Sequence, residues 1–232
     1  MKEEAGTMET LRRHRLVRLS RQGWAGVLNR PWDATARACL AHWAANRLPL
    51  VVTRQSPGVG GLIALGLPAP ACWERRRIAL HVPRSSVLGF EEFPELSEVL
   101  PLLPQPAHAA ARDLQAGLRV CGASARVYGS YGWQVLSGLD HVRPSSDLDV
   151  LVQVENAAHA DDVAQRLAGH AMAQPRCDGE LMFPDGSAVA WREWCEWRAA
   201  RTRAVMVKRL TGAMLWRDNS WCEVHSLEAL AA

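Results

Sequence analysis

The stretch that decides the fold of this chain reads Val127-Tyr-Gly-Ser-Tyr-Gly-Trp-Gln134 and, after a polar link, Ser145-Ser-Asp-Leu-Asp-Val-Leu-Val152. Its pattern predicts a strand, a Gly-Ser turn, a helix and a second strand. Because side chains alternate between the two faces of a strand, we expect Asp147 and Asp149 to point the same way. Neighbouring carboxylates repel each other, and a strand this apolar tolerates them when a divalent cation lies between them. Oxygen ligands of this kind favour Mg²⁺.

Gly129 and Ser130 provide a second functional feature. Glycine lets the backbone approach a ligand closely, and we expect Ser130 at or near the N-cap of a helix over 130–139. The free amides of a helix N-terminus favour phosphate. A phosphate cradle that faces a carboxylate pair is typical of nucleotidyl transfer, in which positioning and charge neutralisation provide most of the catalysis. Either motif alone is common, so the prediction depends on their order and their strand context.

The pair Gly129-Ser130 followed by Asp147-Leu-Asp149 resembles the signature of the DNA polymerase beta-type nucleotidyltransferases. The link of sixteen residues, 131–146, is longer than in most members of that superfamily. Together with Asp178-Gly-Glu-Leu and Ala190-Trp-Arg-Glu, the motif resembles a narrower family, the malonate decarboxylase holo-acyl-carrier-protein synthases, or phosphoribosyl-dephospho-CoA transferases. The likeness is densest from about residue 126 to residue 208, and the first hundred residues resemble the N-terminal domain of that family more loosely.

This resemblance implies a substrate and a reaction that composition and spacing do not reveal. Phosphoribosyl-dephospho-CoA would be transferred from 2'-(5''-triphosphoribosyl)-3'-dephospho-CoA to a serine of the malonate decarboxylase acyl carrier protein subunit, with release of pyrophosphate. Asp147 and Asp149 would hold Mg²⁺, and Gly129 and Ser130 would hold the triphosphate. The implied fold is α+β, with a C-terminal nucleotidyltransferase domain (a mixed sheet flanked by helices) that follows a small α+β domain.

A third acidic group is expected on a later strand, predicted over 176–183. In the superfamily a third carboxylate comes from a strand beside the first two, so the resemblance implies Asp178 as the third metal ligand and as a group that helps to deprotonate the serine. Glu180 lies on the same face of that strand and is the rival, and both could instead face solvent. Lys208, the only lysine beyond residue 2, is a candidate phosphate ligand.

Prolines interrupt the pattern between residues 91 and 106, and we place the domain boundary there. The expected domains are an N-terminal α+β domain over 1–100 and a catalytic domain over 107–232. The basic segment 11–19 is interpreted as a solvated face. Trp133 is interpreted as a core residue rather than a base-stacking one, and three tryptophans at a spacing of three, from Trp191 to Trp197, predict the buried stripe of a helix.

Composition narrows the class of protein. The chain has 232 residues, of which 48% are hydrophobic and 22% charged, as in ordinary soluble globular proteins. Of its 27 basic residues 25 are arginine, but a net charge of +3 is too small to indicate nucleic-acid binding. The six cysteines form no Cys-x-x-Cys pair, which gives no zinc signal. With no apolar segment near the N-terminus, we expect a cytoplasmic protein with reduced cysteines and no membrane partner.

Other functions remain open. The chain could be a nucleotidyltransferase that uses ATP or CTP on another acceptor, or a non-catalytic partner-binding protein on this scaffold, although the intact Asp-x-Asp pair argues against the second. A nucleic-acid binder would need a stronger positive charge. Because carrier proteins are usually acidic around the modified serine, we expect a basic rim at the mouth of the site. Its candidates are Arg143, Arg192, Arg198, Arg201 and Arg203.

Overall fold

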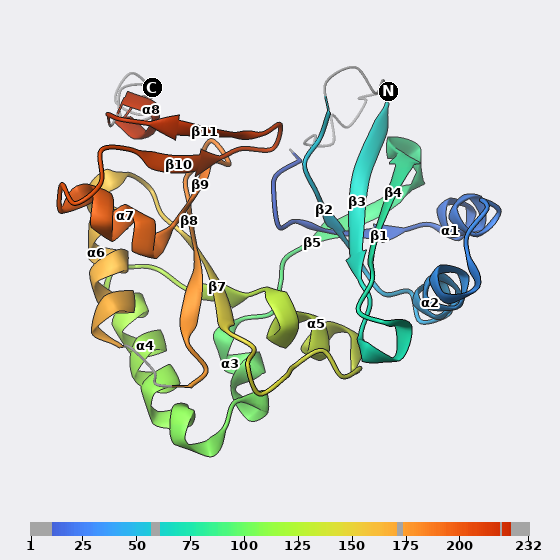
Figure 1. Ribbon diagram of the computed structural model, residues 1–232, viewed down its shortest axis with the longest axis horizontal. Helices are drawn as coiled ribbons and strands as arrows, with labels where there is room; N and C mark the ends of the chain where they lie inside the picture. Colours follow the sequence, from blue (N-terminus) through green and yellow to red (C-terminus); the bar gives the residue numbers. More distant parts are fainter. Residues whose placement is uncertain (1–10, 57–60, 171–173, 219, 224–232) are drawn as a thin grey trace, which may run out of the picture.

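The chain folds around two β-sheets that lie side by side in a computed structural model, which describes residues 11–56, 61–170, 174–218 and 220–223 (Figure 1). The first sheet has the strand order β4-β3-β2-β1-β5, and the second has the order β11-β10-β9-β8-β7-β6. Helices cover the outer side of each sheet. The predicted α+β class with a mixed C-terminal sheet is confirmed. None of the helices in the described part of the chain is long and apolar enough to cross a membrane.

The N-terminal half consists of an antiparallel sheet with two helices packed on one face. Its elements are β1 (Leu16–Leu19), α1 (Arg21–Leu28), α2 (Ala34–Ala45), β2 (Leu50–Val52), β3 (Leu62–Pro68), β4 (Arg77–Pro83) and β5 (Val87–Glu91), with single 3₁₀ turns at Ala71–Trp73 and Arg84–Ser86. The N-cap of α2 is Asp33, whose side chain accepts a hydrogen bond from the amide of Ala36. The other face of this sheet is turned toward the C-terminal half.

The C-terminal half carries the motif. Its elements are α3 (Leu96–Val99), α4 (His108–Val120), β6 (Ala125–Val127), α5 (Gly129–Ser137), β7 (Leu148–Gln153), α6 (Ala157–Gly169), β8 (Cys177–Met182), β9 (Ala188–Ala190), α7 (Trp191–Arg198), β10 (Val205–Lys208), β11 (Ala213–Trp216) and α8 (Ser220–Glu223), with 3₁₀ turns at Leu100–Leu102 and Gln105–Ala107. Strands β7 and β8 are parallel, and the remaining neighbours in the sheet are antiparallel.

The predicted tryptophan stripe forms part of the C-terminal core. Trp191 and Trp194 of α7 are buried, and Trp197 packs against the same cluster. The core also contains Leu114 of α4 and Val163 of α6, so these three helices cover one face of the sheet. The opposite face of this sheet carries Asp149, Asp178 and Glu180, and it is turned toward the N-terminal half.

The two hydrophobic cores meet at the motif. The core of the N-terminal half includes Phe93 and then Trp133 of α5, whose rings meet edge to face with centroids 5.5 Å apart. The core of the C-terminal half includes Leu96 and continues through the rest of the chain. The interpretation of Trp133 as a core residue is therefore confirmed, and α5 packs on both halves at once.

The interpretation of segment 11–19 as a solvated basic face is wrong. Its arginines form ion pairs with nearby acidic side chains, because residues 16–19 form β1 next to β5 and residues 12–15 lie close to Glu92 and Glu180. The pairs are Arg12 and Arg15 with Glu92, Arg18 with Glu91, and Arg13 with Glu180. The glycine-rich segment 58–61, whose composition predicts a turn, lies largely outside the described residues. The amphipathic pattern over 157–173 predicts a helix, and its last three residues also lie outside them.

Candidate active site

The glycine of the motif begins a helix in a conformation that suits glycine. Helix α5 starts at Gly129, one residue earlier than predicted, and its N-cap is Tyr128. Gly129 has a φ of +61°, and a Cβ atom there would lie 1.9 Å from Oδ2 of Asp149. Two effects therefore disfavour a side chain at this position: the strain of the left-handed backbone and the clash with the carboxylate of Asp149. The helix N-terminus and Asp149 lie against each other, as the sequence predicts.

Asp149 and Asp178 lie side by side on neighbouring strands. They are directly opposite each other in the parallel register of β7 and β8, so their side chains project from the same face. Asp147 lies just before β7. Burial, together with the charges of Asp178 and Asp147, raises the pKa of Asp149 to about 6. The cluster therefore carries an unfavourable concentration of negative charge, which a cation would relieve.

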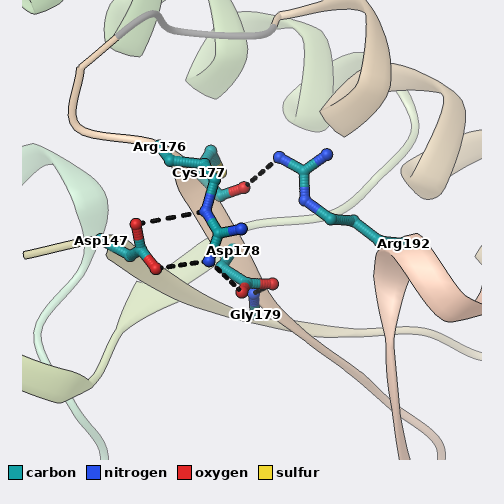
Figure 2. A network of polar contacts seen from close by, with 6 residues as sticks. All are labelled: Asp147, Arg176, Cys177, Asp178, Gly179 and Arg192. Atoms are coloured by element: carbon teal, nitrogen blue, oxygen red, sulfur yellow. Dashed lines mark hydrogen bonds and ion pairs between the residues drawn. The ribbon is translucent and has the colours of Figure 1, made fainter.

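In the structure, Arg176 provides that positive charge (Figure 2). Its Nε donates to Oδ1 of Asp147 at 3.2 Å, and its Nη2 donates to Oδ2 of Asp147 at 2.7 Å and to Oδ2 of Asp178 at 3.3 Å. Asp178 is also oriented through Oδ1, which accepts from the amide of Gly179 at 2.8 Å. Sequence reasoning missed this role of Arg176, although its position two residues before Asp178 is a visible signal.

The three aspartates are oxygen donors of the kind that Mg²⁺ prefers. In the described parts of the chain, however, no three His, Cys, Asp or Glu side chains are arranged as they would be around a metal ion. The chemistry of the donors fits a divalent cation, whereas their present positions fit the guanidinium of Arg176. Loading a metal would therefore require the Arg176 side chain to move aside.

Glu180, the rival third carboxylate, is committed to other partners. It is 5% exposed and bonds to His14 Nε2 at 2.9 Å and to Lys208 Nζ at 2.6 Å, with Arg13 Nη2 at 3.9 Å. Burial alone would raise the pKa of Glu180, but the hydrogen bonds and charges of His14 and Lys208 outweigh it and lower the pKa to about 2. The proposed phosphate ligand Lys208 thus lies next to Glu180, and sequence reasoning did not find His14 or Arg13.

A cleft of about 520 Å³ opens between the two halves at the motif. On the side of the Gly-Ser and Asp-x-Asp motif it is lined by Tyr128, Gly129, Ser130 and Asp149, with His14 beside them. Burial raises the pKa of the Tyr128 hydroxyl, and the charges of Glu180, Asp149 and Asp178 act in the same direction. The opposite wall comes from strands β2, β3 and β4 of the N-terminal sheet. The volume is in the range of small-molecule sites, roughly 300–1,000 Å³.

Several candidate rim arginines already have partners within the chain. Nη2 of Arg192 donates to the carbonyl of Cys177 at 2.9 Å (Figure 2). Arg198 pairs with Asp161, and Arg201 pairs with Glu196. Arg198 and Arg201 remain partly exposed, with side-chain exposures of 37% and 60%. Their positive charge is thus partly neutralised before any carrier protein binds, and a basic rim around the site stays a prediction.

The family models and the similar proteins that match this chain all indicate the same family. The model of the phosphoribosyl-dephospho-CoA transferase MdcG C-terminal domain matches residues 95–219, and the model of the MdcG N-terminal domain matches residues 12–93. The chain is 38% identical over 182 residues to a phosphoribosyl-dephospho-CoA transferase of Bradyrhizobium diazoefficiens, which covers 78% of this chain and 80% of the relative.

Two further relatives carry the same name. The protein of Xanthomonas campestris is 36% identical over 183 residues, covering 78% of this chain and 84% of the relative. The protein of Xanthomonas axonopodis is 32% identical over 202 residues, covering 84% of this chain and 89% of the relative. No solved structure matches the chain.

Proposed function

The chain belongs to the phosphoribosyl-dephospho-CoA transferase family, and from this premise we propose the reaction that its site performs. The donor is 2'-(5''-triphosphoribosyl)-3'-dephospho-CoA, and the acceptor is a serine of the malonate decarboxylase acyl carrier protein subunit. The serine oxygen attacks the phosphorus next to the ribose, the bond to the next phosphate breaks, and pyrophosphate leaves. The reaction belongs in the cytoplasm and needs neither a membrane nor a nucleic acid.

One observation carries the chemistry: the start of α5 at Gly129 lies against Asp149, which itself faces Asp178. This arrangement supports our proposal that the triphosphate of the donor binds at Gly129 and Ser130. Asp147, Asp149 and Asp178 would hold Mg²⁺, which when bound neutralises the phosphate charge. We favour Asp178 over Glu180 as the third carboxylate because Glu180 already bonds to His14 and Lys208 and lies 3.9 Å from Nη2 of Arg13. Asp178 is also the group that we assign to accept the proton of the serine.

The experiment that tests this proposal measures the mass of the carrier. The protein is incubated with Mg²⁺, the apo carrier and either the triphosphoribosyl donor, ATP or CTP. We expect an adduct of phosphoribosyl-dephospho-CoA and released pyrophosphate from the first donor alone. Asp149→Asn serves as the catalytic control, and it should fold but form no adduct, since it weakens a metal ligand without changing the shape of the side chain.

The other outcomes separate the alternatives. An AMP or CMP adduct would keep nucleotidyl transfer and overturn the proposed donor. If no donor gave an adduct and the protein also failed to bind metal, a non-catalytic partner-binding scaffold would be the better description. An Asp149→Asn variant as active as the wild type would remove that residue from the metal site.

A further inference from the structure

The N-terminal sheet presents an unusual face to the site. Along β2, β3 and β4, large apolar side chains point toward α1 and α2 and are buried, as Leu50, Leu65 and Leu80 illustrate. The alternating residues form the wall of the cleft. The three central members of this wall, Val51, Gly66 and Ala79, face each other in register. This face is open toward the aspartates, whereas the other face is filled by the core.

Small residues keep the middle of this wall flat. A Cβ atom at Gly66 would lie 2.8 Å from Cγ2 of Thr53, and Ala79 beside it is exposed. Glycine inside a strand often marks a place where another group approaches the backbone closely. At Gly66 that group is the methyl group of Thr53, which itself lines the cleft. The flat, apolar patch lies within the same cleft as Gly129 and Asp149. A planar apolar group of a ligand would fit on it.

Arg77 supplies a positive charge at the edge of this patch. It lines the cleft next to its register partner Pro68, and its side chain is exposed. Among the residues that the structure describes, none forms a hydrogen bond or ion pair with the Arg77 side chain. By contrast, Arg76 beside it pairs with Asp33 and Glu74. An unpaired guanidinium over a binding cleft favours phosphate.

We infer that the N-terminal sheet is the nucleotide-binding wall of the donor site: the adenine lies on the patch of Val51, Gly66 and Ala79, and Arg77 binds the diphosphate of dephospho-CoA. This inference rests on the proposed function. In that donor, the triphosphate-bearing ribose is attached directly to the adenosine, so the nucleotide is the part that must lie nearest to the metal site. The pantetheine arm then leaves the cleft beyond Arg77.

Two variants test the wall without touching the catalytic residues. Ala79→Trp fills the patch from an exposed position, and Arg77→Ala removes the charge. Their matched controls are His81→Trp, two residues further along β4 and outside the cleft, and Arg119→Ala, an exposed arginine of α4. All four variants change exposed side chains, so melting temperatures close to that of the wild type are expected and are checked first.

Binding is measured calorimetrically with dephospho-CoA on the full-length chain. We expect Arg77→Ala to weaken binding tenfold to a hundredfold, the range for a hydrogen bond to a charged group, and Ala79→Trp to weaken it at least as much. The two controls should bind like the wild type. ADP should displace dephospho-CoA from the wild type, and pantetheine should not. Unchanged binding in both cleft variants, or displacement by pantetheine alone, would overturn the inference.

The transfer assay separates this inference from the proposed function. With the triphosphoribosyl donor, both cleft variants should raise the donor KM about tenfold or more and leave kcat within a few fold. If the wild type forms the adduct and the cleft variants do so with unchanged KM, the proposed function stands and the nucleotide wall is wrong. If the cleft variants lose dephospho-CoA binding but the wild type transfers nothing, the wall stands and the reaction is wrong.

Discussion

At the scale of single residues, the site is built from positions that tolerate little change. Gly129 combines a positive φ with direct contact to Asp149, and Asp149 in turn lies opposite Asp178. The three residues come from a helix start and two parallel strands, and they are packed next to one another in the order Gly129, Asp149, Asp178. His141, which follows α5, shows a different constraint, because it is 5% exposed and its Nε2 atom has no hydrogen-bond partner among the described residues.

Gly129→Ala should abolish most activity and lower stability. The added methyl group meets Oδ2 of Asp149, and the left-handed backbone costs roughly 1–2 kcal/mol in addition. Gly138→Ala is the matched control, since Gly138 has a φ of +70° and no atom within 4 Å of a Cβ. It should show the backbone cost alone, with activity retained. Thermal melts and adduct formation measure both, and equal activity losses in the two variants would argue against the contact with Asp149.

The pH dependence of stability should reveal His141. Burial lowers its pKa from 6.5 to about 4, and the charge of Arg75 acts in the same direction. The folded protein thus keeps the ring neutral, so the stability that this residue contributes is present above pH 6.5 and is lost as the pH falls toward 4. The free energy of unfolding should therefore fall between pH 7.5 and pH 4.5, and His141→Phe should remove about 2 kcal/mol of this fall, as measured by urea titrations at each pH. The exposed His81→Phe should leave the pH profile unchanged, and a His141→Phe profile identical to wild type would contradict the assignment.

At the scale of elements, the parallel pair of β7 and β8 decides the geometry of the acidic cluster. Register sets Asp149 opposite Asp178, and Arg176, which directly precedes β8, reaches back to Asp147. The cluster and its counter-charge therefore come from the same two strand ends. Because the guanidinium bridges two of the proposed metal ligands, a metal ion bound there would compete with Arg176 for the same carboxylates.

Arg176→Ala should make the protein respond more strongly to divalent cations. Without the guanidinium, Asp147 and Asp178 repel each other, so the melting temperature in metal-free buffer should fall and the rise on adding Mg²⁺ should exceed that of the wild type. Mn²⁺ binding followed by electron paramagnetic resonance should tighten as well. Arg192→Ala is the control, because Arg192 bonds to the carbonyl of Cys177 and to none of these aspartates. An unchanged response to metal would show that Arg176 does not compete with the cation.

At the scale of the whole molecule, buried charge joins the two halves. Glu180 of β8 bonds to His14, which precedes β1, and to Lys208 of β10. Backbone hydrogen bonds add to this connection, for example from the amide of Gln55 to the carbonyl of Leu210 at 2.8 Å. The N-terminal half is thereby held over the acidic cluster, and the cleft lies between the two sheets.

Glu180→Gln should therefore destabilise the protein much more than it impairs chemistry. It leaves the cations around it without a buried counter-charge, and breaking such a pair costs about 3–5 kcal/mol. Asp178→Ala should do the reverse, with a loss of rate by orders of magnitude and a melting temperature near that of the wild type. Glu196→Gln, which breaks an exposed pair with Arg201, is the control for surface charge and should change neither. A Glu180→Gln variant that lost its rate and kept its stability would make Glu180 the third carboxylate.

The sequence by itself determined the local order of the motif. Strand alternation set Asp147, Asp149, Asp178 and Glu180 on one side of the sheet, and the Gly-Ser turn set a helix start beside them, because these relations depend on a few consecutive residues. The tryptophan stripe of α7 followed from helical periodicity, and the fold class followed from the family resemblance that the motif residues carry.

Only the tertiary structure decided which charges meet. Glu180 bonds to His14, 166 positions earlier in the chain, and Arg176 lies 29 positions from its partner Asp147. Local spacing carries no information about such pairs, which depend on how two sheets and a connecting segment pack. For the same reason the sequence could not separate a solvated arginine from a paired one, and the partners of Glu180 and the cleft wall with Arg77 became visible only once the two sheets faced each other.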